Sequence, residues 1–244
     1  MESEMIIEMV LSERVHQPRI GGKKLYHILS KDIKQVSISM GRDKFFDLLR
    51  ANNLLVERKR SYTKTTNSYH HFHKYSNLVK DFTISSPNQV WAADITYLRT
   101  EQGFVYLSLL TDMYSRKIVG WALSRSLSIE GSLEALEKSL KECNNSEGVI
   151  HHSDRGVQYC SHEYTNLLLG SKMKISMTEE NHCYENSMAE RVNGILKDEY
   201  MLDFTFKDYA SALKSTEEAI MLYNTRRPHW SLKFKTPEEV HSAA

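Results

Sequence analysis

The spacing of hydrophobic residues changes near residue 85, from a helical period to the short apolar runs of β-strands. In the first part of the chain, apolar residues recur three and four positions apart, as Phe45, Leu48 and Leu49 do. This spacing predicts three short helices, at residues 3–15, about 22–31 and about 42–52.

The chain after residue 85 is predicted to form a sheet with helices. Runs rich in β-branched and aromatic residues, at 90–100, 104–112 and 117–124, indicate a meander of three strands. The further elements expected are a helix at about 128–143, a strand at 149–154, a helix at 162–170, a strand at 174–178, and helices at 187–201 and about 207–223. This order predicts an α/β core with a mixed sheet of ribonuclease-H type at 85–203, followed by a C-terminal helix and tail at 204–244.

Charge is distributed unevenly along the 244 residues, although the formal net charge is only +1. Residues 1–80 hold 15 Lys and Arg against 8 Asp and Glu, a net of +7, and residues 81–244 hold 17 against 23, a net of −6. A basic N-terminal part favours a polyanion such as nucleic acid as its partner. Short helices with basic faces suit a helix-turn-helix-like domain at 1–56, although helical domains that touch no DNA share this pattern.

The segment 57–84 is predicted to be a basic and aromatic linker. It either follows a phosphate backbone, with Tyr62, Tyr69 and Phe72 available to stack on bases, or is an ordinary exposed linker. Zinc binding by the histidines within 70–73 is not expected, because a structural site needs further ligands. The basic residues expected to contact DNA are Arg42, Lys44, Arg50, Arg58, Lys59, Arg60 and Lys64.

Membrane and secreted classes are not expected. No stretch approaches the ~18 apolar residues of a membrane span, and the opening residues lack the blocks of a signal peptide. Cys143, Cys160 and Cys183 form no CxxC pair, so reduced thiols are expected. These features predict a cytoplasmic protein.

Two aspartates are candidates for chemistry. Asp94 interrupts an apolar strand, where a buried carboxylate needs a compensating cation or donor. Asp154 ends a buried strand just before Gly156, at the edge where α/β sheets present functional groups, although it could also be a turn residue. Asp112, the nearest competitor of Asp94, lies in a polar turn and is expected to be solvated.

Glu190 is the third candidate, with an alternative role in a capping box that begins at Ser187. On the predicted helix, one stripe is polar and the opposite one is largely apolar. The polar stripe contains Asn186, Glu190, Asn193 and Lys197, and the opposite stripe contains Met188, Val192, Ile195 and Tyr200. A helix that packs through its apolar stripe would point Glu190 toward the sheet edge that carries both aspartates.

Three converging carboxylates repel one another unless divalent cations hold them, and oxygen ligands favour Mg²⁺ or Mn²⁺. Two such ions activate a water or a sugar 3′-hydroxyl for phosphoryl displacement and stabilise the leaving oxygen, which fits chemistry on DNA. His152 and Asn186 are candidates for positioning ligands or substrate, or are satisfied structural groups.

The blocks WAADITYL, HSDRGVQY and NHCYENSMAERVNGILKDEY resemble the DDE catalytic core shared by retroviral integrases and bacterial insertion-sequence transposases. The 35 residues between Asp154 and Glu190, and the basic residue seven positions after the glutamate, are specific to that core. YNTRRPHWSL with KTPEEV is similar to the C-terminal signature of OrfB-type transposases, which a second, frameshifted reading frame encodes. With the N-terminal helices and KRSYTKTTNS, the resemblance covers nearly the whole chain.

The resemblance implies that Asp94, Asp154 and Glu190 form the metal-binding triad and that Lys197 contacts transposon-end DNA. In relatives the carboxylates hold Mg²⁺ while water and then a DNA 3′-hydroxyl attack phosphodiesters, without a covalent enzyme intermediate. Glu185 stands where many relatives have aspartate, and we expect it to be tolerated because it lies outside the triad. A homo-oligomer on DNA and an OrfA-type partner or fusion segment are also implied.

Two other functions stay open from the sequence. One is a DNA-binding regulator with a decayed core, which the intact carboxylates disfavour. The other is a ribonuclease-H-like nuclease that hydrolyses DNA without joining it, which strand-transfer products would distinguish.

Overall fold

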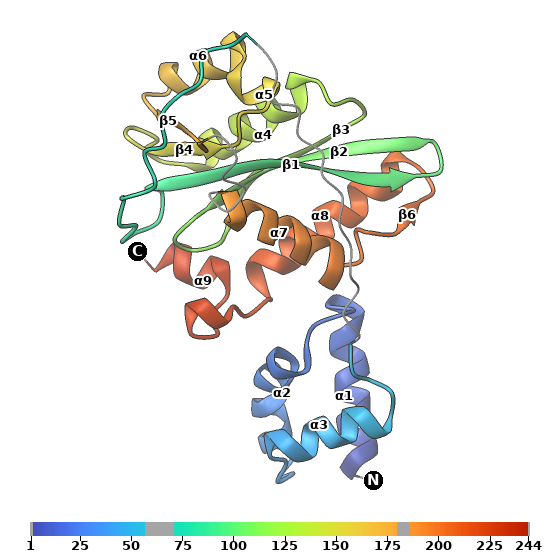
Figure 1. Cartoon of the computed structure of the whole chain (residues 1–244). Coiled ribbons are helices and arrows are strands. Elements are labelled where there is room, and N and C mark those ends of the chain that lie inside the picture. Colours follow the sequence, from blue (N-terminus) through green and yellow to red (C-terminus); the bar gives the residue numbers. More distant parts are fainter. Residues whose placement is uncertain (1, 57–70, 180–185, 244) are drawn as a thin grey trace.

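The computed structural model describes residues 2–56, 71–179 and 186–243, and its larger part has three layers (Figure 1). A six-stranded sheet forms the middle layer. One face is covered by α4 (Ile129–Glu142), α5 (Val157–Cys160) and α6 (His162–Gly170). The other face is covered by α7 (Ser187–Glu199), α8 (Tyr209–Thr225) and α9 (Pro237–Ser242). The prediction of an α/β core is confirmed.

The sheet is mixed, as its element order predicts. The antiparallel meander consists of β1 (Val90–Thr100), β2 (Gly103–Asp112) and β3 (Ile118–Ser124). Parallel to β1 lie β4 (Ile150–Ser153) and then β5 (Lys174–Met177), which gives the order β3-β2-β1-β4-β5. The short β6 (Thr205–Phe206), which also pairs with β1, was not predicted, because two residues carry no readable pattern.

One stretch of β1 has no strand beside it on the β4 side in the described parts of the chain. Before this stretch, β4 pairs with residues 90–92, and after it β6 pairs with residues 99–100. The start of α7 lies against the stretch between them, because Asn186 Nδ2 donates a hydrogen bond to the carbonyl oxygen of Ala93 (3.1 Å). Asp94 is therefore at the place where the sheet edge opens toward α7.

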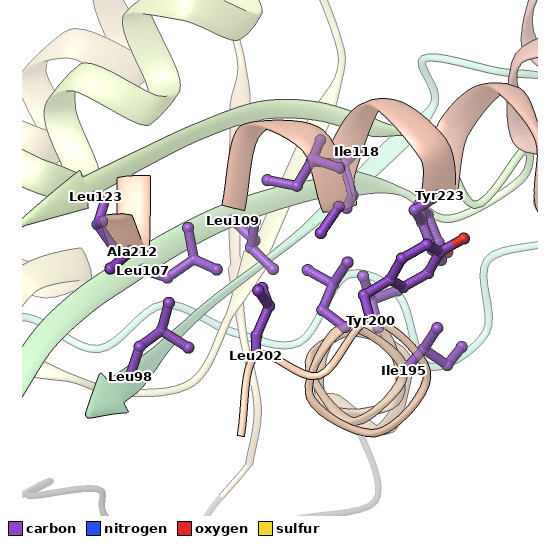
Figure 2. Close-up of a cluster of buried hydrophobic side chains, with 14 of the residues drawn as sticks. Leu98, Leu107, Leu109, Ile118, Leu123, Ile195, Tyr200, Leu202, Ala212 and Tyr223 are labelled. Carbon is purple, nitrogen blue, oxygen red and sulfur yellow. The ribbon is translucent and has the colours of Figure 1, made fainter. Parts of the chain in front are cut away.

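Each face of the sheet has its own hydrophobic core. Figure 2 shows the core on the α7 and α8 side, where Leu98 and Leu107 of the sheet belong to the same cluster as Tyr200 and Tyr223. On the opposite face, α4 packs closely against β3, because a side chain at Gly120 would collide with the carbonyl oxygen of Ala135. Since both faces are packed, the sheet is held as a rigid frame for the side chains at its edge.

The N-terminal helices form a smaller unit beneath the α7, α8 and α9 layer (Figure 1). They are α1 (Glu2–His16), α2 (Gly22–Gln35) and α3 (Arg42–Ala51), close to the predicted ranges. Their separate core contains Ile6, Leu25 and Phe45. A helical N-terminal region is thus confirmed.

Three further expectations from the sequence, on Phe72, on the cysteines and on membrane spans, can be compared with the structure. Phe72 was expected to be free to stack on bases, but it packs with Tyr75 against the core on the α4 and α6 side and meets the His162 ring edge-on at 5.7 Å. Cys143 and Cys160 are free thiols. No helix in the described ranges is long and apolar enough to cross a membrane.

Candidate active site

Asp94 is half-buried in the middle of β1, where it lies between α7 and the end of β4. Burial, and next to it the negative charge of Asp154, raise the pKa of Asp94 to about 7, and Glu190 adds a smaller contribution in the same direction. A hydrogen bond from Asn193 Nδ2 to Asp94 Oδ2 (2.7 Å) opposes this rise. The three predicted carboxylates therefore act on one another, as close neighbours of like charge do.

Asp154 follows directly on β4. Its Oδ1 accepts a hydrogen bond from the backbone N–H of Gly156 (2.9 Å), and a side chain at Gly156 would press on that same oxygen. The turn role considered from the sequence is thus present. It also holds the carboxylate at the C-terminal edge of the sheet, on the side of Asp94, so the two roles are compatible.

Glu190 lies in the first turn of α7 and its side chain is exposed. The capping box considered as an alternative role with Ser187 is not formed, because the N-cap residue of α7 is Asn186 and no side-chain hydrogen bond caps the helix. Of the opposite stripe, Val192, Ile195 and Tyr200 are buried in the core as predicted, and Met188 is partly buried. The polar stripe consequently faces β1.

Asn186 and Asn193 connect α7 to β1, and both are buried. Each donates its amide N–H, to the Ala93 carbonyl oxygen and to Asp94 respectively. The Oδ1 atoms of both are buried and accept no hydrogen bond from the described residues. Asn193 was not singled out as a site residue from the sequence, although its place on the stripe between Glu190 and Lys197 was a signal for it.

The chemistry of these groups fits a hard divalent cation. Carboxylate and amide oxygens are the ligands of Mg²⁺, and like-charged carboxylates are relieved by a cation between them. Within the described ranges, no three His, Cys, Asp or Glu side chains lie close enough together to hold a metal ion. Joint binding by Asp94, Asp154 and Glu190 thus requires their carboxylates to come closer together.

His152 lies in β4 and is buried. Its Nδ1 hydrogen-bonds with the hydroxyl of Ser176 on β5 (2.9 Å), and the same hydroxyl accepts the backbone N–H of Leu78 (2.9 Å). These bonds fasten the segment that precedes β1 to the sheet, which is a structural contribution. A role of His152 in positioning ligands stays a prediction.

Lys197 lies two turns after Glu190 on the same stripe of α7. It is half-buried, and its Nζ lies 4.5 Å from the centre of the Tyr97 ring in a cation–π contact. Burial lowers the pKa of Lys197, and the nearby Tyr97 and Asp94 oppose that shift. The side chain is therefore not fully solvated and lies over β1 on the side of Asp94, and its contact with DNA stays a prediction.

The basic residues predicted to contact DNA are only partly within the described ranges. Arg42, Lys44 and Arg50 are exposed on α3, and the two arginines form surface ion pairs with Asp43 (2.7 Å) and Asp47 (2.6 Å). Surface pairs of this kind are weak and do not prevent contact with a phosphate. The other four, Arg58, Lys59, Arg60 and Lys64, lie outside the described residues.

The prediction that Asp112 is solvated is wrong, because its side chain is fully buried. It accepts hydrogen bonds from the backbone N–H of Asn88, the backbone N–H of Ser115 and the hydroxyl of Ser115, each at 2.7 Å. The sequence showed a polar turn, and could not show that this turn closes over the carboxylate. With its acceptor oxygens occupied by donors, Asp112 is a structural aspartate.

A mixed sheet with Asp94 and Asp154 at its open edge fits the class of polynucleotidyl transferases with an integrase core, and comparison with known proteins assigns the chain to that class. Models of the integrase core domain match residues 85–183 and residues 171–237. An uncharacterized 31 kDa protein of insertion element IS600 from Shigella sonnei is 34% identical over 222 residues, which covers 88% of this chain and 82% of that protein. The chain belongs to the family of bacterial insertion-sequence transposases with an integrase core.

Another relative and two solved structures agree. Transposase InsF of insertion sequence IS3A from Escherichia coli strain K12 is 36% identical over 143 residues, which covers 58% of this chain and 50% of InsF. The HTLV-2 integrase catalytic core, solved with magnesium, has a TM-score of 0.52 at 18% identity and covers 64% of this chain and 97% of that core. A chain of the simian T-cell lymphotropic virus intasome, in complex with PP2A regulatory subunit B56 gamma, has a TM-score of 0.55 at 16% identity, covering 83% of this chain and 67% of that one. These likenesses confirm the ribonuclease-H-like fold.

Proposed function

We propose that this transposase binds the ends of its insertion sequence, cleaves a DNA strand there in a Mg²⁺-dependent reaction, and joins the resulting 3′-hydroxyl to target DNA. The observation that carries the proposal is the half-buried Asp94, whose pKa the neighbouring Asp154 and Glu190 help to raise. Carboxylates with strongly raised pKa values cluster at functional sites, and a bound cation relieves repulsion of this kind. Family membership supplies the substrate class.

In this proposal Asp94, Asp154 and Glu190 hold Mg²⁺ or Mn²⁺, two ions at a time. Bound ions supply the activation of the attacking oxygen and the stabilisation of the leaving oxygen. The protein contributes the placement of its own groups. Asn193 orients Asp94 through its 2.7 Å hydrogen bond, Asn186 fastens α7 to the open edge of β1, and Lys197 binds a DNA phosphate near the carboxylates.

The partners in this proposal are DNA, further copies of the chain assembled on that DNA, and an OrfA-type segment. The exposed side chains of Arg42, Lys44 and Arg50 on α3 support DNA contact by the N-terminal helices. Arg58, Lys59, Arg60 and Lys64 stay predicted DNA contacts from their sequence alone.

The test is Mg²⁺-dependent nicking and strand transfer on labelled DNA that carries the insertion-sequence end. Asp94→Asn, Asp154→Asn and Glu190→Gln should each lose both steps and still bind DNA, whereas Glu134→Gln, a neutralised acid on α4, should act like wild type. Cleavage without joined products would favour the nuclease alternative. Binding without cleavage by the wild-type protein, with Mg²⁺ and with Mn²⁺, would favour the regulator and contradict the proposal.

A further inference from the structure

The C-terminal motif YNTRRPHWSL, at residues 223–232, lies against the N-terminal helices. Its first arginine, Arg226, donates from Nε and Nη2 to the two carboxylate oxygens of Glu13 on α1, at 2.9 and 2.6 Å. Glu13 is buried, and its Oε1 also accepts a hydrogen bond from Gln17 Nε2 (2.9 Å). A paired geometry of this kind fixes orientation as well as distance. The motif thus holds α1 at a defined angle.

The second arginine of the motif links three parts of the chain. Arg227 is buried and donates from Nε and Nη2 to the carboxylate of Glu199, both at 2.8 Å. Glu199 is the last residue of α7, and its Oε1 also accepts from Lys24 Nζ of α2 (2.8 Å). Its backbone carbonyl oxygen accepts the N–H of Arg19 (3.1 Å). Glu199 therefore connects the end of α7 both to the N-terminal helices and to the C-terminal motif.

Aromatic side chains extend this contact. Trp230 of the motif lies under Lys23 of α2, whose Nζ is 3.8 Å from the ring centre. Phe234 stacks on His27 of α2, with ring centres 4.5 Å apart, and meets Trp230 at 5.0 Å. Since both arginines and Trp230 of the motif, and Phe234 just after it, contact α1, α2 or Glu199, this part of the chain forms the junction of the two units. We name the set Glu13, Lys24, Glu199, Arg226 and Arg227 the junction clasp.

The same helix carries the junction clasp and the candidate site. Glu199 lies nine residues after Glu190 and six after Asn193 on α7, about 14 Å and 9 Å along the helix axis. A helix held at both ends behaves as a stiff rod over this length. A movement of the N-terminal helices relative to Glu199 would therefore change where any DNA that they hold lies relative to Asp94.

We propose that Glu199 and Arg227 are positioning residues, which fix the N-terminal helices on α7 so that end DNA bound by those helices reaches the carboxylates in one register. This inference rests on the proposed function. Packing alone would hold the two units together, because apolar groups of similar volume can replace a buried ion pair with no loss of stability. A paired arginine–carboxylate contact adds direction, and registry is the best-attested use of buried ionic groups.

The experiment compares Lys24→Met, Glu199→Gln and Arg227→Lys with wild type in the full chain. Lys24→Met is the variant expected to destabilise the protein least, because it leaves the Arg227–Glu199 pair intact. It therefore keeps the test possible if Glu199→Gln does not fold. Lys31→Met is the matched control, since it removes a lysine from an exposed position of α2. The expected result for the three clasp variants is a kcat for end cleavage reduced roughly 10- to 100-fold, with cut positions spread over neighbouring nucleotides. The Kd for end DNA should stay within about twofold, as for other changes away from the contact surface.

A charge exchange sharpens the test. Glu13→Arg and Arg226→Glu should each lower kcat and spread the cut positions, and the double variant should restore a single cut position, because the pair is one-to-one across the junction. A merely structural role would lower the amount of folded protein without moving the cut.

A second readout does not depend on activity. Spin labels on unnatural amino acids at the exposed Lys34 of α2 and Glu137 of α4 report the distance between the two units. Wild type should give one narrow distance distribution, and Lys24→Met and Glu199→Gln should broaden it. Distributions and cut positions like those of wild type in all clasp variants would overturn the inference. If wild type does not cleave, the proposed function fails, and the distance distributions alone decide whether the clasp fixes the units.

Discussion

Asp94 and Asp112 are two aspartates of the same sheet whose carboxylates are removed from water in different surroundings. Asp112 is fully buried and receives three hydrogen bonds at 2.7 Å, two of them from backbone N–H groups. Asp94 is less buried, receives a side-chain hydrogen bond from Asn193 and a backbone hydrogen bond from Ile95, and lies in the field of Asp154 and Glu190. Burial by itself therefore does not mark a functional carboxylate. The balance between donors and like charges does.

The first way to test this comparison is to neutralise each aspartate in turn. Asp112→Asn should lower the free energy of unfolding by about 3 kcal/mol, because each hydrogen bond to a charged group contributes about 1.5–3 kcal/mol and the new amide N–H opposes one of the two backbone N–H donors in either orientation. Asp94→Asn should leave the free energy of unfolding unchanged or raise it at pH 8 without metal, because it removes repulsion. Urea unfolding of both variants measures this. Equal losses in the two variants would contradict the comparison.

The second test uses pH. Because the pKa of Asp94 is raised to about 7, the folded state binds a proton more tightly than the unfolded state does. The free energy of unfolding should therefore fall as pH rises from about 4 to 7, with a limiting slope near 1.4 kcal/mol per pH unit from this group. Asp94→Asn should remove this slope and Asp112→Asn should keep it. Parallel wild-type and Asp94→Asn curves would show that Asp94 titrates normally.

Lys197 provides a third, smaller effect at the same site. Lys197→Ala should slow end cleavage about tenfold at subsaturating DNA, because a phosphate contact beside the carboxylates is lost. Its free energy of unfolding should fall by no more than about 1 kcal/mol, the value of a cation–π contact. Lys197→Arg, which keeps the charge over Tyr97, is the matched control. Cleavage by the alanine variant at the wild-type rate would remove Lys197 from the site.

The smallest expected effect concerns the N-terminal helices. Arg42→Gln, Lys44→Gln and Arg50→Gln should each reduce the slope of log K against log salt by about 0.9 if the residue contacts a phosphate. Lys172→Gln, on the exposed surface of the core, should leave the slope unchanged. Binding of end DNA measured over a range of salt concentrations separates the two results. Unchanged slopes in all three α3 variants would place DNA elsewhere.

The elements of the fold could be predicted from the sequence because the pattern that specifies them is local. The stripe of Val192, Ile195 and Tyr200 predicted the buried face of α7, and with it the direction of Asn193 and Lys197. The same local signals failed where a distant backbone decides the outcome. The donor from Asn88 to Asp112 lies 24 residues away, and nothing in the turn itself shows it.

The junction clasp illustrates the same limit at longer range. Glu13 and Arg226 are 213 residues apart, and Lys24 and Glu199 are 175 apart. From the sequence alone, each of these residues is predicted to be an ordinary surface charge on or next to a helix. The resemblance of YNTRRPHWSL to a family signature marked the motif, but only its contacts with α1, α2 and α7 indicate what it does.

The central claim is that the carboxylates around Asp94 are arranged to hold divalent cations and that Asp112 is not. Calorimetric titration of wild type, Asp94→Asn and Asp112→Asn with Mg²⁺ at pH 8, on protein shown to be folded, tests it most directly. We predict that wild type and Asp112→Asn bind Mg²⁺ alike and that Asp94→Asn does not bind it. Binding by Asp94→Asn as tight as that of wild type would contradict the claim.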